Sequence, residues 1–211
     1  MTAEAPTSPE DVFVNCPFDD EYAGTFRALI FAILACGFRP RSARETDDGG
    51  EARIEKLYAI IQSCRYGIHD ISRTELDSEN GLPRFNMPLE LGIFMGAKRY
   101  GLKRQREKRL LIFDKDKYRY QKFMSDIAGM DIHAHGGKPD RALVETRDWL
   151  TNVSRRQLLG GNELLALHRT GRSLPLVESG SRCIPVPLRL AEKVPRSSST
   201  RKMSLPRGRH W

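Results

Sequence analysis

The chain has 211 residues, with 35 Lys and Arg against 27 Asp and Glu, a formal net charge of +8 and a pI of about 9.5. This length accommodates one ordinary domain and an additional segment. No run approaches the ~20 apolar residues that a membrane span needs, and the polar first ten residues lack the apolar stretch of a signal peptide. We therefore expect a cytoplasmic protein with reduced thiols and no membrane partner.

In chain order, short apolar runs alternate with segments whose apolar residues recur at helical spacing. A polar arm over residues 1–10 comes first. The runs predict strands over 12–14, 38–43, 66–71, 110–113 and 131–134. The helical segments are predicted over 21–36, 51–63, 86–98, 118–128 and 139–150, with Gly37 as a stop signal, Asn86 as an N-cap and Pro88 in a first turn.

This alternation of strand and helix is typical of a parallel sheet covered on both faces. We predict an α/β domain over residues 11–150 with a doubly wound, flavodoxin-like sheet of five parallel strands in the order 2-1-3-4-5. Residues 151–172 form a partly helical extension, with helix expected within 157–168.

The basic excess lies at the C-terminal end of the chain. From residue 151 onward there are 12 basic and 3 acidic residues, so the preceding part is close to neutral. Residues 173–211 are rich in Pro, Ser and Arg and have no apolar period, which predicts a disordered basic tail. Solvated arginines are the default in such a tail, and we do not expect nucleic acid as a partner.

Ligands of open parallel sheets bind outside the carboxyl ends of the strands, where the strand order reverses. Here that place lies between the first and third strands. Asn15 follows the first predicted strand, ahead of Phe18 and Tyr22, and Asp70 lies near the end of the third, ahead of Ser72. The helix from Asn86 carries Glu90 near its start, so we expect the Glu90 carboxylate in one crevice with Phe18, Asp70 and Ser72.

Each candidate also has a purely structural interpretation. Glu90 between Leu89 and Leu91 can simply complement the helix dipole. Asp70 can cap a backbone turn. His69 alternates with Asp70 along the strand, so a core histidine is favoured. Arg53 can meet a phosphate at a helix start or remain solvated.

Several site classes have no support in the sequence. His133 and His135 form an HxH pair, but no third metal ligand is apparent and we reject a metal site. No GxxxxGK[ST], GxGxxG or GxSxG motif occurs, and Gly49-Gly50 alone is too weak for a phosphate loop. We expect no bound cofactor.

The segment LPRFNMPLELGIFMG, residues 82–96, resembles the RxNVxxELGxFxG segment of bacterial TIR-like nucleotide-binding proteins, and the related nucleoside 2-deoxyribosyltransferases carry a comparable ExG segment. The opening VFVNCPFDDEY and the stretch YGIHDIS resemble the first and third strands of the same superfamily. The likeness covers about residues 11–150, and its most specific part is the cluster of Arg84, Asn86, Glu90 and Gly92.

The resemblance implies a site that cleaves an N-glycosidic bond, with Glu90 acting at the anomeric carbon of a nucleoside or of the nicotinamide ribose of NAD. Residue chemistry agrees, because a fixed carboxylate can stabilise or attack the oxocarbenium-like carbon that develops. Asp70 and Ser72 would hold ribose hydroxyls, and Phe18 or Tyr22 would stack on a base. Asn15, Arg53, Arg84 and Asn86 complete the expected substrate-binding set.

NAD or a related nucleotide is thus the expected substrate, in an enzyme of bacterial defence or signalling that becomes active as a homo-oligomer. Cys16 stands where the transferases usually have glycine, which argues against transferase activity more than against NAD cleavage. The alternative function is a non-catalytic module that senses nucleotides or assembles, since a fold alone does not settle activity.

Overall fold

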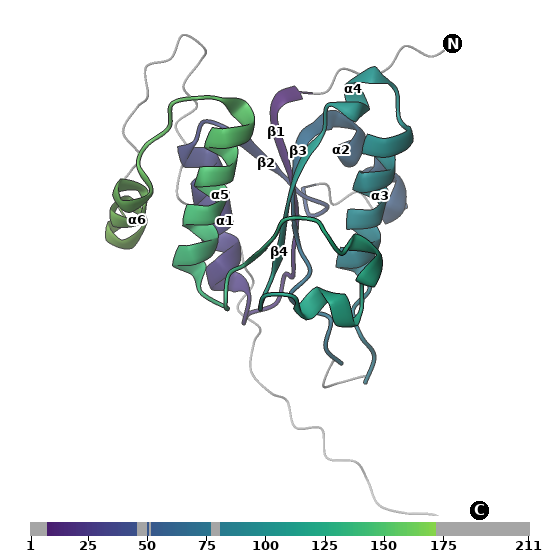
Figure 1. Ribbon diagram of the computed structural model, residues 1–211. Helices are drawn as coiled ribbons and strands as arrows, with labels where there is room; N and C mark the ends of the chain where they lie inside the picture. The colour runs from purple at the N-terminus through teal and green to yellow at the C-terminus, as the bar shows by residue number, and fades with distance from the viewer. Residues whose placement is uncertain (1–7, 46–49, 51, 77–80, 172–211) are drawn as a thin grey trace, which may run out of the picture. The chain divides into compact units, whose positions relative to one another are not determined.

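The predicted alternation of strands and helices is present in the computed structural model, which describes residues 8–45, 50, 52–76 and 81–171 (Figure 1). The strands are β1 (Ser8–Asn15), β2 (Arg39–Arg41), β3 (Cys64–Asp70), β4 (Arg109–Asp114) and β5 (Ile132–Ala134). The helices are α1 (Ala23–Ala35), α2 (Arg53–Ser63), α3 (Asn86–Tyr100), α4 (Lys103–Arg106), α5 (Pro139–Ser154) and α6 (Gly161–Thr170).

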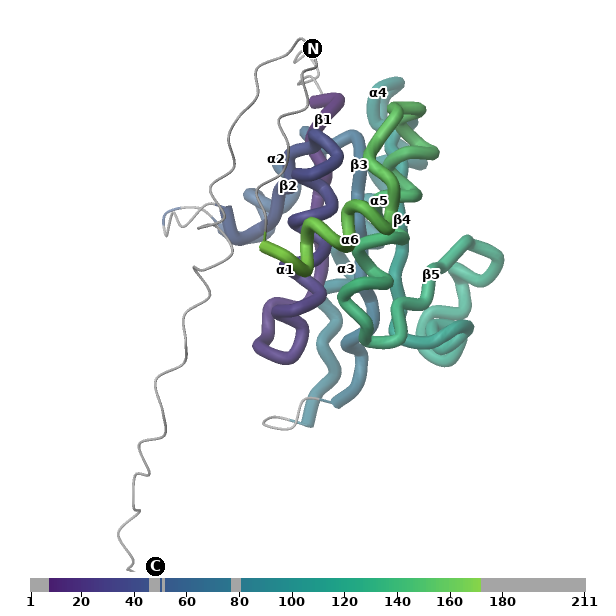
Figure 2. The backbone as a smooth tube through the Cα atoms, turned by 90° about the vertical axis from the view of Figure 1, so that its left-hand side faces the viewer, coloured from purple at the N-terminus to yellow at the C-terminus, as the bar shows by residue number. Residues whose placement is uncertain are grey.

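All neighbouring strands of the sheet pair in parallel, in the order β2-β1-β3-β4-β5. The strand labels follow this order across Figure 2. Both the α/β class and the strand order predicted from the sequence are confirmed. The carboxyl ends of β1 and β3 lie side by side, with Asn15 opposite His69.

Helices cover the two faces of the sheet, with α1, α5 and α6 on one side and α2, α3 and α4 on the other (Figure 1). Alternate side chains of the strands supply the two cores. Val12 and Val14 of β1 pack on the α1 side, whereas Phe13 packs against α2 and α3. On β3, Ile68 belongs to the α1 side, and His69 contacts Phe94 of α3.

A buried stack of side chains holds α3 against the sheet. The ring of His69 contacts that of Phe94 edge to face at 4.9 Å, and the Lys108 amine lies 4.6 Å from the Phe94 ring centroid. Lys108 also donates to the carbonyls of Ile61, at 2.6 Å, and Cys64, so it satisfies the C-terminal end of α2. A Cβ on Gly67 would approach Phe94 to 2.7 Å, so only glycine leaves room for this stack.

The edge strand β2 is tied to its neighbour by a buried carboxylate. Asp11 of β1 is 1% exposed and accepts hydrogen bonds from Arg39 Nε at 2.6 Å and Arg41 Nη1 at 2.8 Å. Two cations thus compensate one buried negative charge. The middle residue of β2 is Pro40, which lies opposite Val12 of β1.

Some predicted boundaries are wrong. Ser8 to Glu10 were assigned to the polar arm, but they begin β1, because Ser8 pairs with Cys64 of β3. The helix predicted over 118–128 is two short 3-10 turns, Arg119–Lys122 and Ser125–Ile127. The backbone of Tyr118 has a φ of 61°, a left-handed conformation that an α-helix does not contain.

Other expectations fare better. Gly37 ends α1 as predicted, with a φ of 76° that lets the Phe38 N–H reach the Ile33 carbonyl at 3.0 Å. The partly helical extension contains α6, while α5 continues to Ser154 instead of stopping at 150. The predicted tail over 173–211 and arm residues 1–7 lie outside the described residues. Among the helices that are described, none has the length and apolar character to cross a membrane.

Candidate active site

A hollow of about 160 Å³ opens between the carboxyl end of β1 and the start of α3. In Figure 1 this edge of the sheet is at the bottom. Its lining combines the turn after β1, the first residue of α2 and the first turns of α3. The lining residues are Asn15, Cys16, Pro17, Phe18, Arg53, Arg84, Asn86, Met87 and Glu90. The structure therefore brings together six of the nine predicted site residues.

Glu90 is the carboxylate of this hollow. Its side chain is partly buried, and burial raises its pKa from the ordinary 4.5 to about 7, against the opposing charge of Arg53. Within the described ranges, no hydrogen-bond donor or ion-pair partner contacts the Glu90 carboxyl. A carboxyl group that is half desolvated and has no donor is available to a ligand.

The position of Glu90 is set by Asn15. The Asn15 side-chain amide donates to the Met87 carbonyl of α3 at 2.8 Å and to His69 Nδ1 at 3.1 Å. The acceptor role of Nδ1 leaves the His69 proton on Nε2, and burial lowers the pKa of this histidine to about 3, so the ring is neutral. Asn15 lines the hollow, but both hydrogens of its amide are already donated to protein acceptors. Asn15 therefore positions α3, whereas the sequence led us to expect that it binds substrate.

Asn86 does not cap α3, contrary to the prediction. The cap residue is Phe85, whose carbonyl accepts from the Leu89 N–H at 2.9 Å, and no side chain completes the cap. Asn86 is already the first helical residue and its side chain is exposed at the hollow. The anchor of α3 therefore comes from β1, five elements earlier in the chain.

Two arginines lie at the rim of the hollow. Arg53 is the first residue of α2 and is exposed. Arg84 precedes α3, and its guanidinium lies 3.3 Å from Asp19, which also accepts from Arg73 at 2.9 Å. Burial alone would raise the pKa of Asp19, but the hydrogen bonds from Arg73 and the Tyr22 N–H lower it. Asp19 is thus a fixed anion that holds Arg84 near the hollow.

Phe18 lies in the hollow with much of its ring already in contact with the protein. It packs edge to face on Phe26 at 5.5 Å, and the Arg44 guanidinium lies 5.1 Å from its ring centroid. A base that stacked on Phe18 would have to displace Arg44 or use the remaining face. Phe18 therefore lines the hollow as predicted, but Phe26 and Arg44 already contact its ring.

Asp70, Tyr22 and Ser72 do not line the hollow. Asp70 is fully buried and accepts hydrogen bonds from the Tyr22 hydroxyl and, at 2.8 Å, from the Ser72 N–H. His135 Nε2 lies 3.0 Å from the same carboxylate, while its Nδ1 accepts from the Gly137 N–H at 2.9 Å. The Asp70 carboxylate and the Tyr22 hydroxyl are thus buried and hydrogen-bonded to each other, so neither base stacking by Tyr22 nor sugar binding by Asp70 is available.

The physical reason is the alternation of side chains along β3. Asp70 points to the same face as Ile68, where Tyr22 begins α1, whereas His69 points to the α3 face that carries Glu90. The expected crevice is thus divided between two faces. Burial, followed by the charges of Asp70, Glu90 and Asp19, raises the pKa of Cys16 well above its usual range, so this thiol is neutral.

Both histidines of the HxH pair contact carboxylates, and no cluster of three or more potential metal ligands is found among the described residues. His133 Nδ1 lies 2.6 Å from Glu145, and His135 belongs to the Asp70 group. His69 is the core histidine that its alternation predicts. These contacts account for both histidines of the HxH pair.

Sequence reasoning missed Asp19, Met87 and the anchoring role of Asn15. The acidic pair Asp19-Asp20 directly after the first strand was a usable signal for a group that orients arginines. The arrangement as a whole offers one available carboxyl, two cations at its rim and one aromatic wall. Comparison with family models, with curated proteins and with solved structures found no match to this chain.

Proposed function

We propose that the protein cleaves the N-glycosidic bond of NAD or a related nucleotide, with Glu90 as the catalytic residue. The observation that carries this proposal is the Glu90 carboxyl itself, partly buried at the end of the sheet with no donor contacting it among the described residues. A structural carboxylate in such a place would normally accept hydrogen bonds, because an unpaired buried charge is costly.

The reaction breaks the bond between C1′ of the ribose and the nicotinamide nitrogen. The bonding electron pair leaves with the ring, which becomes neutral nicotinamide, and the sugar carbon becomes an oxocarbenium-like cation. Ionised Glu90 stabilises this charge from a fixed position. Water then bonds to C1′ and releases one proton, which gives ADP-ribose.

The dimensions of the hollow favour one ribose-sized group, since 160 Å³ is below the range of about 300–1,000 Å³ that whole ligands occupy. The rest of the nucleotide would lie outside it. Arg53 and Arg84 at the rim suit the pyrophosphate, because guanidinium groups pair with phosphate oxygens in a planar geometry. Exposed Asn86 is placed for a sugar hydroxyl.

The raised pKa of Glu90 suits the proposed substrate. Near pH 7 about half of the Glu90 carboxyls are ionised in the free protein. A positively charged nicotinamide ring in the hollow would favour the ionised form, because an opposite charge nearby lowers a carboxyl pKa. Substrate binding would therefore generate the charge that the transition state needs. The setting that we propose, from the TIR-like resemblance, is bacterial defence or signalling with activation by self-assembly.

The decisive experiment follows nicotinamide release from NAD by the full chain, at high and low protein concentration and with and without a crowding agent. We expect Glu90→Gln to lower turnover at least 100-fold, since a lost charge opposite a developing cation costs about 2.7–4 kcal/mol. The control is Glu163→Gln, which makes the same change of a carboxylate to an amide at an exposed position in the first turn of α6 and should leave turnover unchanged.

Release that persists unchanged in Glu90→Gln would contradict the assignment. NAD binding without any release, even at high concentration, would favour the non-catalytic nucleotide sensor instead.

A further inference from the structure

The amino edge of the sheet, opposite the Glu90 hollow, carries a dense group of cations. Seven basic residues from the start of β3, the end of α3, α4 and the start of β4 lie there. We call them the amino-edge basic surface: Arg65, Lys98, Arg99, Lys103, Arg104, Arg106 and Arg109. The near-neutral total charge of residues 1–150 conceals this concentration, because it is summed over the whole of that segment.

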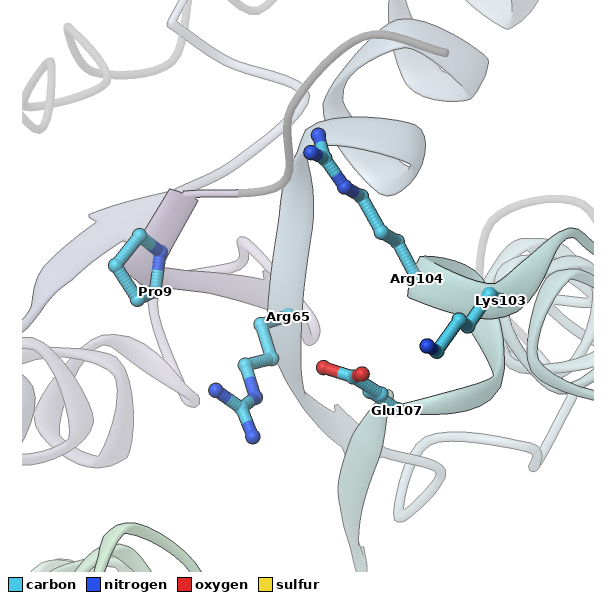
Figure 3. Close-up of a pocket in the computed structure, with 5 residues that line it drawn as sticks. All are labelled: Pro9, Arg65, Lys103, Arg104 and Glu107. Carbon is cyan, nitrogen blue, oxygen red and sulfur yellow. The ribbon is translucent and has the colours of Figure 1, made fainter.

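A hollow of about 400 Å³ lies on this surface and is lined by Pro9, Arg65, Lys103, Arg104 and Glu107. Figure 3 shows these side chains arranged around a common open space, with Arg65 from the sheet on one side and α4 on the other. Glu107 is the only acidic residue in the lining. The hollow is thus framed by three cations and one anion.

Among the described residues, the cations of this surface have no counter-ion within ion-pair distance. Arg65 Nε is buried without any hydrogen-bond partner there. Burial and then the positive charge of Arg109 lower the pKa of Lys98, which is a sign of like charges held close together.

The framework beneath the cations is well connected. Lys98 donates to the carbonyls of Arg106, at 3.5 Å, and Lys108, and Gln105 of α4 donates to the Gln62 carbonyl of α2 at 3.0 Å. The Arg106 guanidinium returns to the Gly101 carbonyl at 3.0 Å. Because helix ends and strand starts are joined in this way, the charges are held near one another before any ligand arrives.

An exposed aromatic residue adjoins the cations. Tyr100 ends α3 and is 85% exposed, and Leu102, two residues later, is 66% exposed. Both stand in the segment Arg99-Tyr100-Gly101-Leu102-Lys103-Arg104, directly between basic residues. The two side chains are thus exposed and adjacent to basic residues on both sides.

We infer that the amino-edge basic surface binds single-stranded nucleic acid. Cations distributed over several elements suit a chain of phosphates better than a single anion, and release of counter-ions from that chain supplies affinity. An exposed tyrosine beside such cations offers a face on which a base can stack. This site lies at the edge of the sheet opposite Glu90 and does not depend on NAD cleavage.

The test measures binding of a fluorescent 20-nucleotide oligouridine to the full chain by anisotropy, over a series of NaCl concentrations. The variant Lys103→Glu with Arg104→Glu should weaken binding at least tenfold. The slope of log affinity against log salt should become shallower by about 1.4, from two lost phosphate contacts at about 0.7 each. The matched control, Lys117→Glu with Lys122→Glu, changes the same charge at exposed positions of the carboxyl edge and should bind nearly as the unaltered chain does.

A second variant separates nucleic acid from other polyanions. Tyr100→Ala should weaken oligouridine binding at least fivefold and leave heparin binding unchanged, because heparin has no bases to stack. No binding by the unaltered chain, equal losses in both charge variants, or an unchanged affinity in Tyr100→Ala would each overturn the assignment. Circular dichroism of every variant confirms that the exposed substitutions leave the fold intact.

Discussion

Two acidic side chains near the C-terminal ends of the strands, Asp70 on one face of the sheet and Glu90 on the other, differ in their hydrogen bonding. On the α1 face, Asp70 is fully buried and accepts from Tyr22, Ser72 and, at 3.0 Å, approaches His135. On the α3 face, Glu90 is partly buried and has no donor among the described residues. A saturated carboxylate stabilises the fold, whereas an unsaturated one is kept for a ligand.

The more deeply buried of these two carboxyl groups is not the one that we propose to be catalytic. Asp70 is the more deeply buried of the two and ends a strand, yet its carboxylate already accepts hydrogen bonds within the protein. Glu90 costs the fold some stability, because nothing offsets its partial desolvation. Proteins commonly retain such local costs at functional sites. Four measurements would break or sharpen this contrast.

The largest effect is expected from Asp70→Asn. The new amide group would point a donor at the donors of Tyr22, Ser72 or His135, so the free energy of unfolding should fall by about 3 kcal/mol. Urea denaturation measures this change. Glu90→Gln serves as the paired control and should cost less than about 1 kcal/mol. Similar losses in the two variants would remove the distinction between the faces.

The next effect concerns pH. Catalysis by ionised Glu90 predicts that kcat/KM for NAD falls about tenfold for each unit of pH below about 7 and levels off above it. Folded Glu90 keeps its proton up to about pH 7, whereas the unfolded chain loses it near 4.5, so the folded state binds more protons between these values.

The free energy of unfolding should therefore decrease as pH rises from 4.5 to about 7, and Glu90→Gln should remove this part of the slope. An activity that rises on acidification would instead assign Glu90 as a general acid.

A smaller effect is expected when the anchor of α3 is removed. Asn15→Ala leaves the Met87 carbonyl and His69 Nδ1 without their shared donor, which should cost about 2 kcal/mol of stability. Turnover should fall more than tenfold, since displacing a reacting group by 1 Å can cost about 100-fold. Asn86→Ala is the contrasting variant. It changes stability by less than about 0.5 kcal/mol, because Asn86 does not cap the helix.

The smallest expected effect isolates one hydrogen bond. Tyr22→Phe removes the hydroxyl that donates to Asp70 and nothing else of the ring. The free energy of unfolding should fall by about 1 kcal/mol, with nicotinamide release unchanged. Loss of turnover comparable to that of Asn15→Ala would show that the α1 face contributes to the reaction after all.

The fold was predictable because its signals are local and repeated. Apolar runs such as Val12-Phe13-Val14 alternate with helical spacing, and few topologies are compatible with five such units. The 3-10 turns after β4 were not predictable in this way, since the apolar spacing of 118–128 imitates a helix and only the backbone of Tyr118 breaks it.

The candidate site was predictable in its position and less so in its members. The reversal of strand order pointed to the ends of β1 and β3. The hollow lies at the end of β1, where Glu90, Phe18, Arg53 and Arg84 line it together, and no residue of β3 belongs to its lining. Asp70 and Glu90 lie on opposite faces because successive side chains of β3 alternate between the two faces of the sheet. The alternation that directs His69 toward α3 therefore directs Asp70 away from it. The hydrogen bond from Asn15 to Met87 joins residues 72 positions apart, and no local pattern reports it.

The edge strand β2 has a consequence for how copies of this chain can associate. A free edge normally invites the edge of another molecule, which adds strands and can lead to amyloid-like growth. Here the edge is three residues long, contains Pro40 without an N–H, and is flanked by arginines held on Asp11. The opposite edge, β5, is equally short. Copies of this protein would therefore associate through their helices, and the sheets of neighbouring copies would not pair edge to edge.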